Sequence, residues 1–127
     1  MQKERRRVMN KKILVCDDDE GILEMMELFL EDAGYEVIAV RESVNVLSEA
    51  ASRKPNLIIL DIWMPVISGD RILRSLRAQE PTASIPVILF SASREGQGIA
   101  EREGANGFVS KPFNLDELLQ QISEKAS

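Results

Sequence analysis

Short aliphatic runs recur along the chain, and each is followed at once by turn-forming or charged residues. Three of them cover residues 13–16, 57–60 and 107–109, where the sequence reads ILVC, LIIL and GFV. Runs of this length, rich in aliphatic side chains and without polar alternation, are typical of strands that are buried on both faces. We therefore predict a sheet that is covered by helices on both sides.

Strand-like and helix-like segments alternate along the whole chain. Ser43 is expected to cap the second helix, with Val44, Leu47 and Ala51 on its inward face. Asn114 is expected to cap the last helix. The strands are predicted at 12–16, 36–40, 57–61, 86–90 and 107–109, and the helices at 22–33, 43–54, 70–79, 94–103 and from 115 onward. Five strands that alternate with five helices predict an α/β fold with a doubly wound parallel sheet.

Charged residues follow three of the predicted strands. Asp17 and Asp18 follow the first strand, Asp61 ends the third, and Lys111 comes shortly after the fifth. If these strands are parallel, their carboxyl ends lie at one edge of the sheet, where open α/β sheets bind ligands. Clustered carboxylates repel one another unless a cation lies among them, and Mg²⁺ takes carboxylate, phosphate and water oxygens. The residues themselves therefore predict a metal-assisted phosphoryl site.

The composition limits which other functions are open to the chain. Its 127 residues are 44% hydrophobic and 29% charged, which fits one domain with a hydrophobic core. No apolar run approaches the roughly 20 residues that a membrane helix needs, so no membrane association is expected. The absence of histidine excludes His-based zinc sites and catalytic triads. The one cysteine, Cys16, excludes an internal disulfide and is expected to be a core residue rather than a reactive thiol.

The net charge of −5 is unevenly distributed. Residues 1–12 carry six Lys or Arg and one Glu, which leaves a net charge of −10 for the rest of the chain. Such an acidic body does not suit direct nucleic-acid binding. We expect residues 1–11 to form a basic extension. Its Arg5, Arg6 and Arg7 either contact an acidic partner or are simply solvated.

Four motifs together resemble those of a known family. They are LVCDD at 14–18, LDIWMP at 60–65, LFSA at 89–92 and GFVSKPF at 107–113. In this order they are similar to the acidic pair, the phosphoacceptor loop, the switch hydroxyl and the switch aromatic and lysine of response-regulator receiver domains in two-component signalling. The resemblance implies a flavodoxin-like fold with strand order 2-1-3-4-5 and a receiver domain over residues 12–127.

The resemblance also implies a role for each polar residue of the site. Asp61 is expected to be the phosphoacceptor. Mg²⁺ is expected to be held by Asp17, Asp18 and Asp61 together with the backbone carbonyl of Trp63. Asp18 is the more direct ligand of the acidic pair, and Asp17 acts through water. Lys111 is expected to pair with the Asp61 carboxylate at rest and with a phosphoryl oxygen after transfer.

Two further residues are expected to transmit the signal. Ser91 would donate its hydroxyl to the phosphoryl group and draw in the loop after the fourth strand. Phe108, which packs in the core, would then move inward and change the face formed by the fourth helix, the fifth strand and the fifth helix. Pro112 resembles the family's cis proline.

The resemblance implies a phosphorylation switch rather than an enzyme that acts on a separate substrate. The chain is expected to be cytoplasmic, and the donor is expected to be a phosphohistidine on a sensor histidine kinase or a histidine phosphotransfer protein. The output is expected to lie in a partner, or in a domain outside this sequence. Leu23 and Leu28, with Ile22 near the mouth of the site, are candidates for docking of the helical donor.

Two other interpretations stay open from the sequence. Asp17 and Asp19 after a strand also resemble the start of a haloacid-dehalogenase-type phosphatase, whose first Asp is phosphorylated, although Gly21 stands where Thr or Val is expected. The other is a receiver-like module that no longer accepts phosphate. The position of a phosphoaspartate and the binding of Mg²⁺ distinguish the three.

Overall fold

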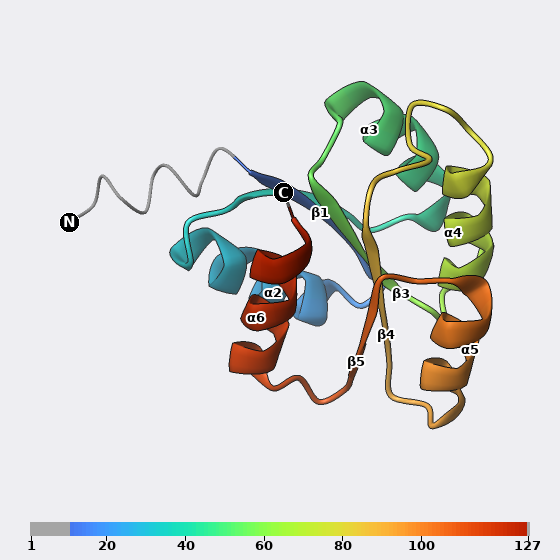
Figure 1. The fold of residues 1–127 in the computed structure, drawn as a ribbon. Coiled ribbons are helices and arrows are strands. Elements are labelled where there is room, and N and C mark those ends of the chain that lie inside the picture. The colour runs from blue at the N-terminus through green and yellow to red at the C-terminus, as the bar shows by residue number, and fades with distance from the viewer. Residues whose placement is uncertain (1–10, 127) are drawn as a thin grey trace.

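The computed structural model describes residues 11–126, and strands and helices alternate within that range (Figure 1). The strands are β1 (Lys12–Cys16), β2 (Glu36–Val40), β3 (Leu57–Asp61), β4 (Val87–Ser91) and β5 (Gly107–Ser110). The helices are α2 (Glu20–Asp32), α3 (Val46–Arg53), α4 (Gly69–Arg77), α5 (Glu95–Glu103) and α6 (Leu115–Lys125), and the short 3₁₀ turn η1 (Ser43–Asn45) precedes α3. No helix of residues 11–126 is both long and apolar enough to cross a membrane. The basic extension predicted for residues 1–11 lies outside the described residues, except for Lys11.

The neighbouring strands are all parallel, and their order is β2-β1-β3-β4-β5. This confirms the doubly wound, flavodoxin-like topology that was predicted. Cys16 pairs with Leu60, and Asp61 pairs with Phe90, so each central strand ends within one residue of its neighbour. The residues that follow β1, β3, β4 and β5 therefore come together at one edge of the sheet.

Helices cover both faces of the sheet. Figure 1 shows α2 and α6 on one face and α3, α4 and α5 on the other. β3 and β4 are buried along their whole length. Ile59 and Phe90 pack in the α2–α6 layer, whereas Leu60 and Leu89 pack in the opposite layer. Because successive side chains of a strand point to opposite faces, this two-sided burial explains the uninterrupted aliphatic runs.

The inward face of the second helical segment differs from the prediction. Val44 is 53% exposed, and Leu47 and Ala51 are only partly buried. The fully buried residues are instead Val46 and Ala50. The α-helix begins at Val46, after the 3₁₀ turn, so the apolar stripe that faces the sheet is displaced from the one expected for a helix that begins at residue 43.

The two predicted helix caps have different outcomes. The Ser43 hydroxyl does not cap a helix, because it donates a hydrogen bond to the carbonyl of Pro65 at 2.9 Å. The cap at Asn114 is confirmed, since its side-chain oxygen accepts a hydrogen bond from the N–H of Glu117 at 3.0 Å.

The buried face of α2 includes a leucine that was expected at its edge. Leu23, Met26 and Leu30 form this face, and Leu23 is only 7% exposed. Leu28, by contrast, is 70% exposed. The prediction that Leu23 helps to dock a partner is therefore wrong, because its side chain belongs to the core.

Candidate functional site

Four charged side chains meet at the carboxyl edge of the sheet. One carboxylate oxygen from each of Asp17, Asp18 and Asp61 lies within 4.8 Å of the other two. The ammonium nitrogen of Lys111 lies 3.3 Å from Oδ2 of Asp17 and 3.6 Å from Oδ2 of Asp61. The structure thus brings together the acids and the lysine that the sequence singled out, and the lysine charge opposes three carboxylates.

Burial makes two of these carboxylates hard to ionise. Asp17 is fully buried and Asp61 is 5% exposed. Burial raises the pKa of Asp61 from 3.8 to about 6, and the charge of Asp17 adds to the rise, while Lys111 and the backbone N–H of Trp63 oppose it. Burial also raises the pKa of Asp17, against a hydrogen bond from the backbone of Asp19 and the charge of Lys111. Since burial is the main cause of both raised pKa values, a cation bound beside these carboxylates would favour their ionised forms.

The acids after β1 have different surroundings. Asp17 accepts a hydrogen bond from the N–H of Asp19 on Oδ1 at 2.8 Å, and its Oδ2 faces Lys111. Asp18 is exposed. Asp19 caps α2 by accepting a hydrogen bond from the N–H of Ile22 at 3.1 Å. Asp18 is therefore the acid of the pair best placed to offer an oxygen to a cation, and Asp19 stabilises the start of the helix.

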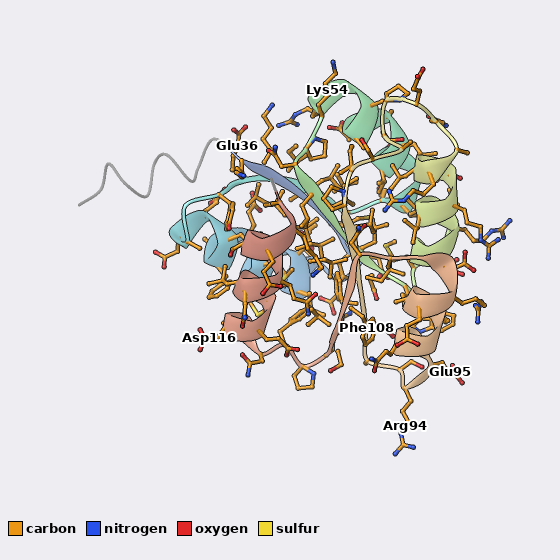
Figure 2. All side chains as sticks on the ribbon, in the orientation of Figure 1. Glu36, Lys54, Arg94, Glu95, Phe108 and Asp116 are labelled. Carbon is orange, nitrogen blue, oxygen red and sulfur yellow. The ribbon has the colours of Figure 1, made fainter. Side chains whose placement is uncertain are left out.

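The two predicted switch residues, Ser91 and Phe108, both lie next to Gly96. Ser91 is fully buried, and its oxygen accepts a hydrogen bond from the N–H of Ser93 at 2.9 Å, so its own proton can be donated elsewhere. Figure 2 shows Phe108 between the sheet and α5. A Cβ on Gly96 of α5 would lie 2.8 Å from Cε1 of Phe108 and 2.9 Å from Cβ of Ser91. Gly96 therefore provides the room for this ring, which the sequence pattern did not indicate.

One aromatic ring, that of Phe90, lies against Lys111, and it was not predicted as part of the site. The peptide bond between Lys111 and Pro112 is cis, as the resemblance predicted. The ammonium nitrogen of Lys111 lies 4.9 Å from the centroid of the Phe90 ring. The ring of Phe113 packs against Phe90 with centroids 5.1 Å apart and planes tilted by 58°. The signals in the sequence are that Phe90 directly precedes Ser91 and that Phe113 follows Lys111 by two residues.

Trp63 and Cys16 flank the site. The Trp63 side chain is 52% exposed, and its backbone N–H bonds the Asp61 carboxylate. The role of its carbonyl as a metal ligand stays a prediction. The buried Cys16 thiol donates to the sulfur of Met64 at 3.5 Å, and burial raises its pKa to about 12. Cys16 is thus a protonated core residue, as predicted.

Comparison with known proteins identifies the family. Residues 13–123 match the family model described as the response regulator receiver domain. The chain belongs to this family. The receiver domain is 35% identical over 116 residues to the alkaline phosphatase synthesis transcriptional regulatory protein PhoP of Bacillus subtilis, covering 90% of this chain and 48% of that protein. It is 35% identical over 119 residues to the phosphate regulon transcriptional regulatory protein PhoB of Pseudomonas aeruginosa, covering 91% of this chain and 51% of that protein. The receiver domain therefore spans about half the length of these curated relatives.

Solved structures agree with this assignment. The chemotaxis protein CheY4 of Vibrio cholerae matches with a TM-score of 0.83 and 31% identity, covering 91% of this chain and 98% of that chain. The receiver domain of the sensor histidine kinase PA1611 of Pseudomonas aeruginosa, whose structure has a magnesium ion coordinated in the active site cleft, matches with a TM-score of 0.83 and 28% identity, covering 91% of this chain and 97% of that chain. Receiver domains are signalling domains rather than classical enzymes. The phosphatase interpretation is therefore rejected.

Proposed function

We propose that the receiver domain takes a phosphoryl group onto Asp61 in a Mg²⁺-dependent reaction and then changes its α5–β5–α6 surface. The observation that supports this most is the meeting of three carboxylates with Lys111 at the edge of the sheet. Among these acids, Asp61 ends the central strand and also contacts Lys111.

Transfer requires an ionised Asp61 carboxylate. Its pKa of about 6 leaves it largely ionised above neutral pH. One carboxylate oxygen forms a bond to phosphorus while the P–N bond of the phosphohistidine donor breaks, and the leaving imidazole keeps the electron pair and binds a proton. Lys111, which already faces Asp61, offers an N–H to a phosphoryl oxygen. Ser91 offers its hydroxyl proton to another.

The proposed cation is Mg²⁺, held by Asp17, Asp18, Asp61 and the carbonyl of Trp63. The hard carboxylate oxygens of the three acids and the raised pKa values of Asp17 and Asp61 fit such an ion. When bound, Mg²⁺ neutralises the charge of the phosphoryl oxygens during transfer. The exposed Asp18 binds directly in this proposal, and Asp17 binds through water.

The proposed donor is a sensor histidine kinase or a histidine phosphotransfer protein. An open apolar groove lies beside Lys111, between α2 and the loop before α6, and its lining includes Ile22, Met25, Pro112 and Phe113. Such a groove suits the apolar face of a donor helix. The signal would pass from the α5–β5–α6 surface to a protein partner or an output domain, without direct contact of this domain with nucleic acid. A cytoplasmic location is part of the same proposal.

The test is to locate the phosphoryl group. The domain is incubated with acetyl phosphate and Mg²⁺, the acyl phosphate is reduced with borohydride, and the product is mapped by mass spectrometry. We expect the label on Asp61 and no label in Asp61→Asn. The control variant Asp32→Asn, which alters an exposed acid at the end of α2, should be labelled like the wild type. Full labelling of Asp61→Asn would overturn the assignment, and failure of the wild type to bind Mg²⁺ would favour a module that does not accept phosphate.

A further inference from the structure

The ammonium group of Lys111 is supported by an aromatic ring as well as by carboxylates. Its nitrogen lies over the Phe90 ring, 4.9 Å from the centroid, which is within the roughly 6 Å at which a ring face attracts a cation. Phe90 is fully buried, and the Lys111 side chain is only 18% exposed. Because little water reaches this contact, the attraction is stronger than at an exposed site.

The Phe90 ring is fixed at the level of the phosphoacceptor. Phe90 of β4 pairs with Asp61 of β3, so the register of the sheet sets its height. The tilted ring of Phe113 packs against it at 5.1 Å, an arrangement that aromatic pairs favour. Both rings belong to the apolar layer between the sheet and the helices α2 and α6. Turning Phe90 away from Lys111 would therefore require this layer to repack.

An uncharged ring is a suitable contact for Lys111, because in the proposed function its ammonium group moves from carboxylate oxygens to a phosphoryl oxygen. The contacts of its nitrogen with Asp17 and Asp61 are 3.3 and 3.6 Å long, whereas a tight charge-assisted hydrogen bond is about 2.8 Å. Another carboxylate would hold the ammonium group more strongly, but it would compete with the incoming phosphoryl oxygens. A ring face orients the ammonium group and leaves N–H groups available to oxygen acceptors.

We propose that Phe90 is a positioning residue for phosphoryl transfer, because its ring face holds the Lys111 ammonium between Asp17 and Asp61. This inference rests on the proposed role of Asp61 as the phosphoacceptor. It means that the negative potential of the Phe90 ring, and not only its volume, sets the rate at which Asp61 is phosphorylated.

The test replaces Phe90 by phenylalanines that carry one, two or three ring fluorines. These keep the ring close to its natural shape and weaken the negative potential of its face. Phosphorylation by acetyl phosphate with Mg²⁺ should slow stepwise, by about two- to fivefold over the series. The same series at Phe29, a partly buried ring of the same layer on α2, is the matched control and should leave the rate unchanged. Mg²⁺ affinity should stay constant in both series, and the urea midpoint should fall slightly in the Phe90 series only, because a favourable contact of the folded state is weakened there.

A second measurement does not depend on phosphorylation. Ring current from Phe90 should shift the ε-methylene protons of Lys111 upfield in the NMR spectrum of the wild type, and Phe90→Leu should remove this shift. A flat fluorine series, or an unchanged Lys111 signal in Phe90→Leu, overturns the inference, while a wild type labelled on Asp61 leaves the proposed function intact. If Phe90→Leu does not fold, the fluorine series decides. Absence of label on Asp61 in the wild type refutes the proposed function itself, and the NMR comparison still decides whether the ring holds the ammonium group.

Discussion

Replacement of Asp61 by Asn should make the domain more stable at neutral pH. The pKa of Asp61 rises from 3.8 to about 6 on folding, chiefly because the side chain is buried and then because of the charge of Asp17. Since the folded value is the higher one, the stability contributed by this group is fully present below pH 3.8 and is lost as the pH rises through about 6. At about 1.4 kcal/mol for each pKa unit, ionisation of Asp61 costs the folded state roughly 3 kcal/mol.

Asparagine removes this cost with little change of shape. Its side-chain oxygen can still accept the hydrogen bond from the N–H of Trp63, and Lys111 keeps its contact with Asp17 at 3.3 Å. We expect the free energy of unfolding of Asp61→Asn to exceed that of the wild type by about 2 to 3 kcal/mol at pH 7.5 without Mg²⁺. In urea unfolding, this gain raises the midpoint by about 1 to 2 M. Near pH 4 the two midpoints should coincide, because Asp61 is then protonated in the folded wild type.

The matched control is Asp116→Asn. Asp116 is exposed in the first turn of α6, where a negative charge is favoured, so its replacement should lower stability by less than about 1 kcal/mol. Mg²⁺ should stabilise the wild type more than Asp61→Asn, which lacks a proposed ligand. A destabilising Asp61 charge is refuted if Asp61→Asn is no more stable than the wild type at pH 7.5, or if its gain in stability persists unchanged at pH 4.

Three other predictions follow from particular contacts. Gly96→Ala places a Cβ 2.8 Å from Cε1 of Phe108. It should therefore lower the free energy of unfolding by about 1 kcal/mol and shift the NMR signals of the Phe108 ring. Unchanged ring signals would contradict the packing of Phe108 against Gly96. Val66 has a φ of 72°, in the left-handed region that asparagine adopts more easily than valine. Val66→Asn should therefore raise the free energy of unfolding by about 1 kcal/mol. A urea midpoint equal to that of the wild type would show that the backbone at Val66 is not strained. Mg²⁺ should change the fluorescence of Trp63 in the wild type and much less in Asp18→Ala. Unchanged Trp63 emission, despite independent proof that Mg²⁺ binds, would contradict the proposed role of the Trp63 carbonyl as a metal ligand.

The alternation of elements and the place of the site could be predicted because both depend on local patterns. The runs at 13–16 and 57–60 contain side chains that must be buried on both faces of a strand, and this is visible in the residues themselves. Parallel strands then bring the residues at their carboxyl ends, including Asp17 and Asp61, to one edge. The strand order came from the family resemblance, since periodicity does not distinguish the order of buried strands.

Contacts between distant segments could not be predicted in the same way. The prediction of the inward face of the helix after Ser43 is wrong. The Ser43 hydroxyl donates a hydrogen bond to the carbonyl of Pro65 in another loop, and no local pattern reveals this contact. The aromatic support of Lys111 likewise depends on how the rings pack across the sheet. Gly96 could be recognised from the sequence only as a weak position in a helix, whereas in the structure its missing side chain makes room for Phe108.

The packing around Gly96 also determines how a change at Asp61 can reach the surface. Ser91 is fully buried, and the ring of Phe108 fills the space that a side chain at Gly96 would take, directly beside Ser91. If the Ser91 hydroxyl is drawn toward a phosphoryl group on Asp61, the loop between β4 and α5 must follow, and a closely packed ring cannot stay in place when its neighbours move. Phenylalanine has no hydroxyl group with which to signal this movement. Under the proposed function, the signal is therefore a change in the shape of the α5–β5 face, and it should depend on the volume of residue 96 more than on any hydrogen bond made by residue 108.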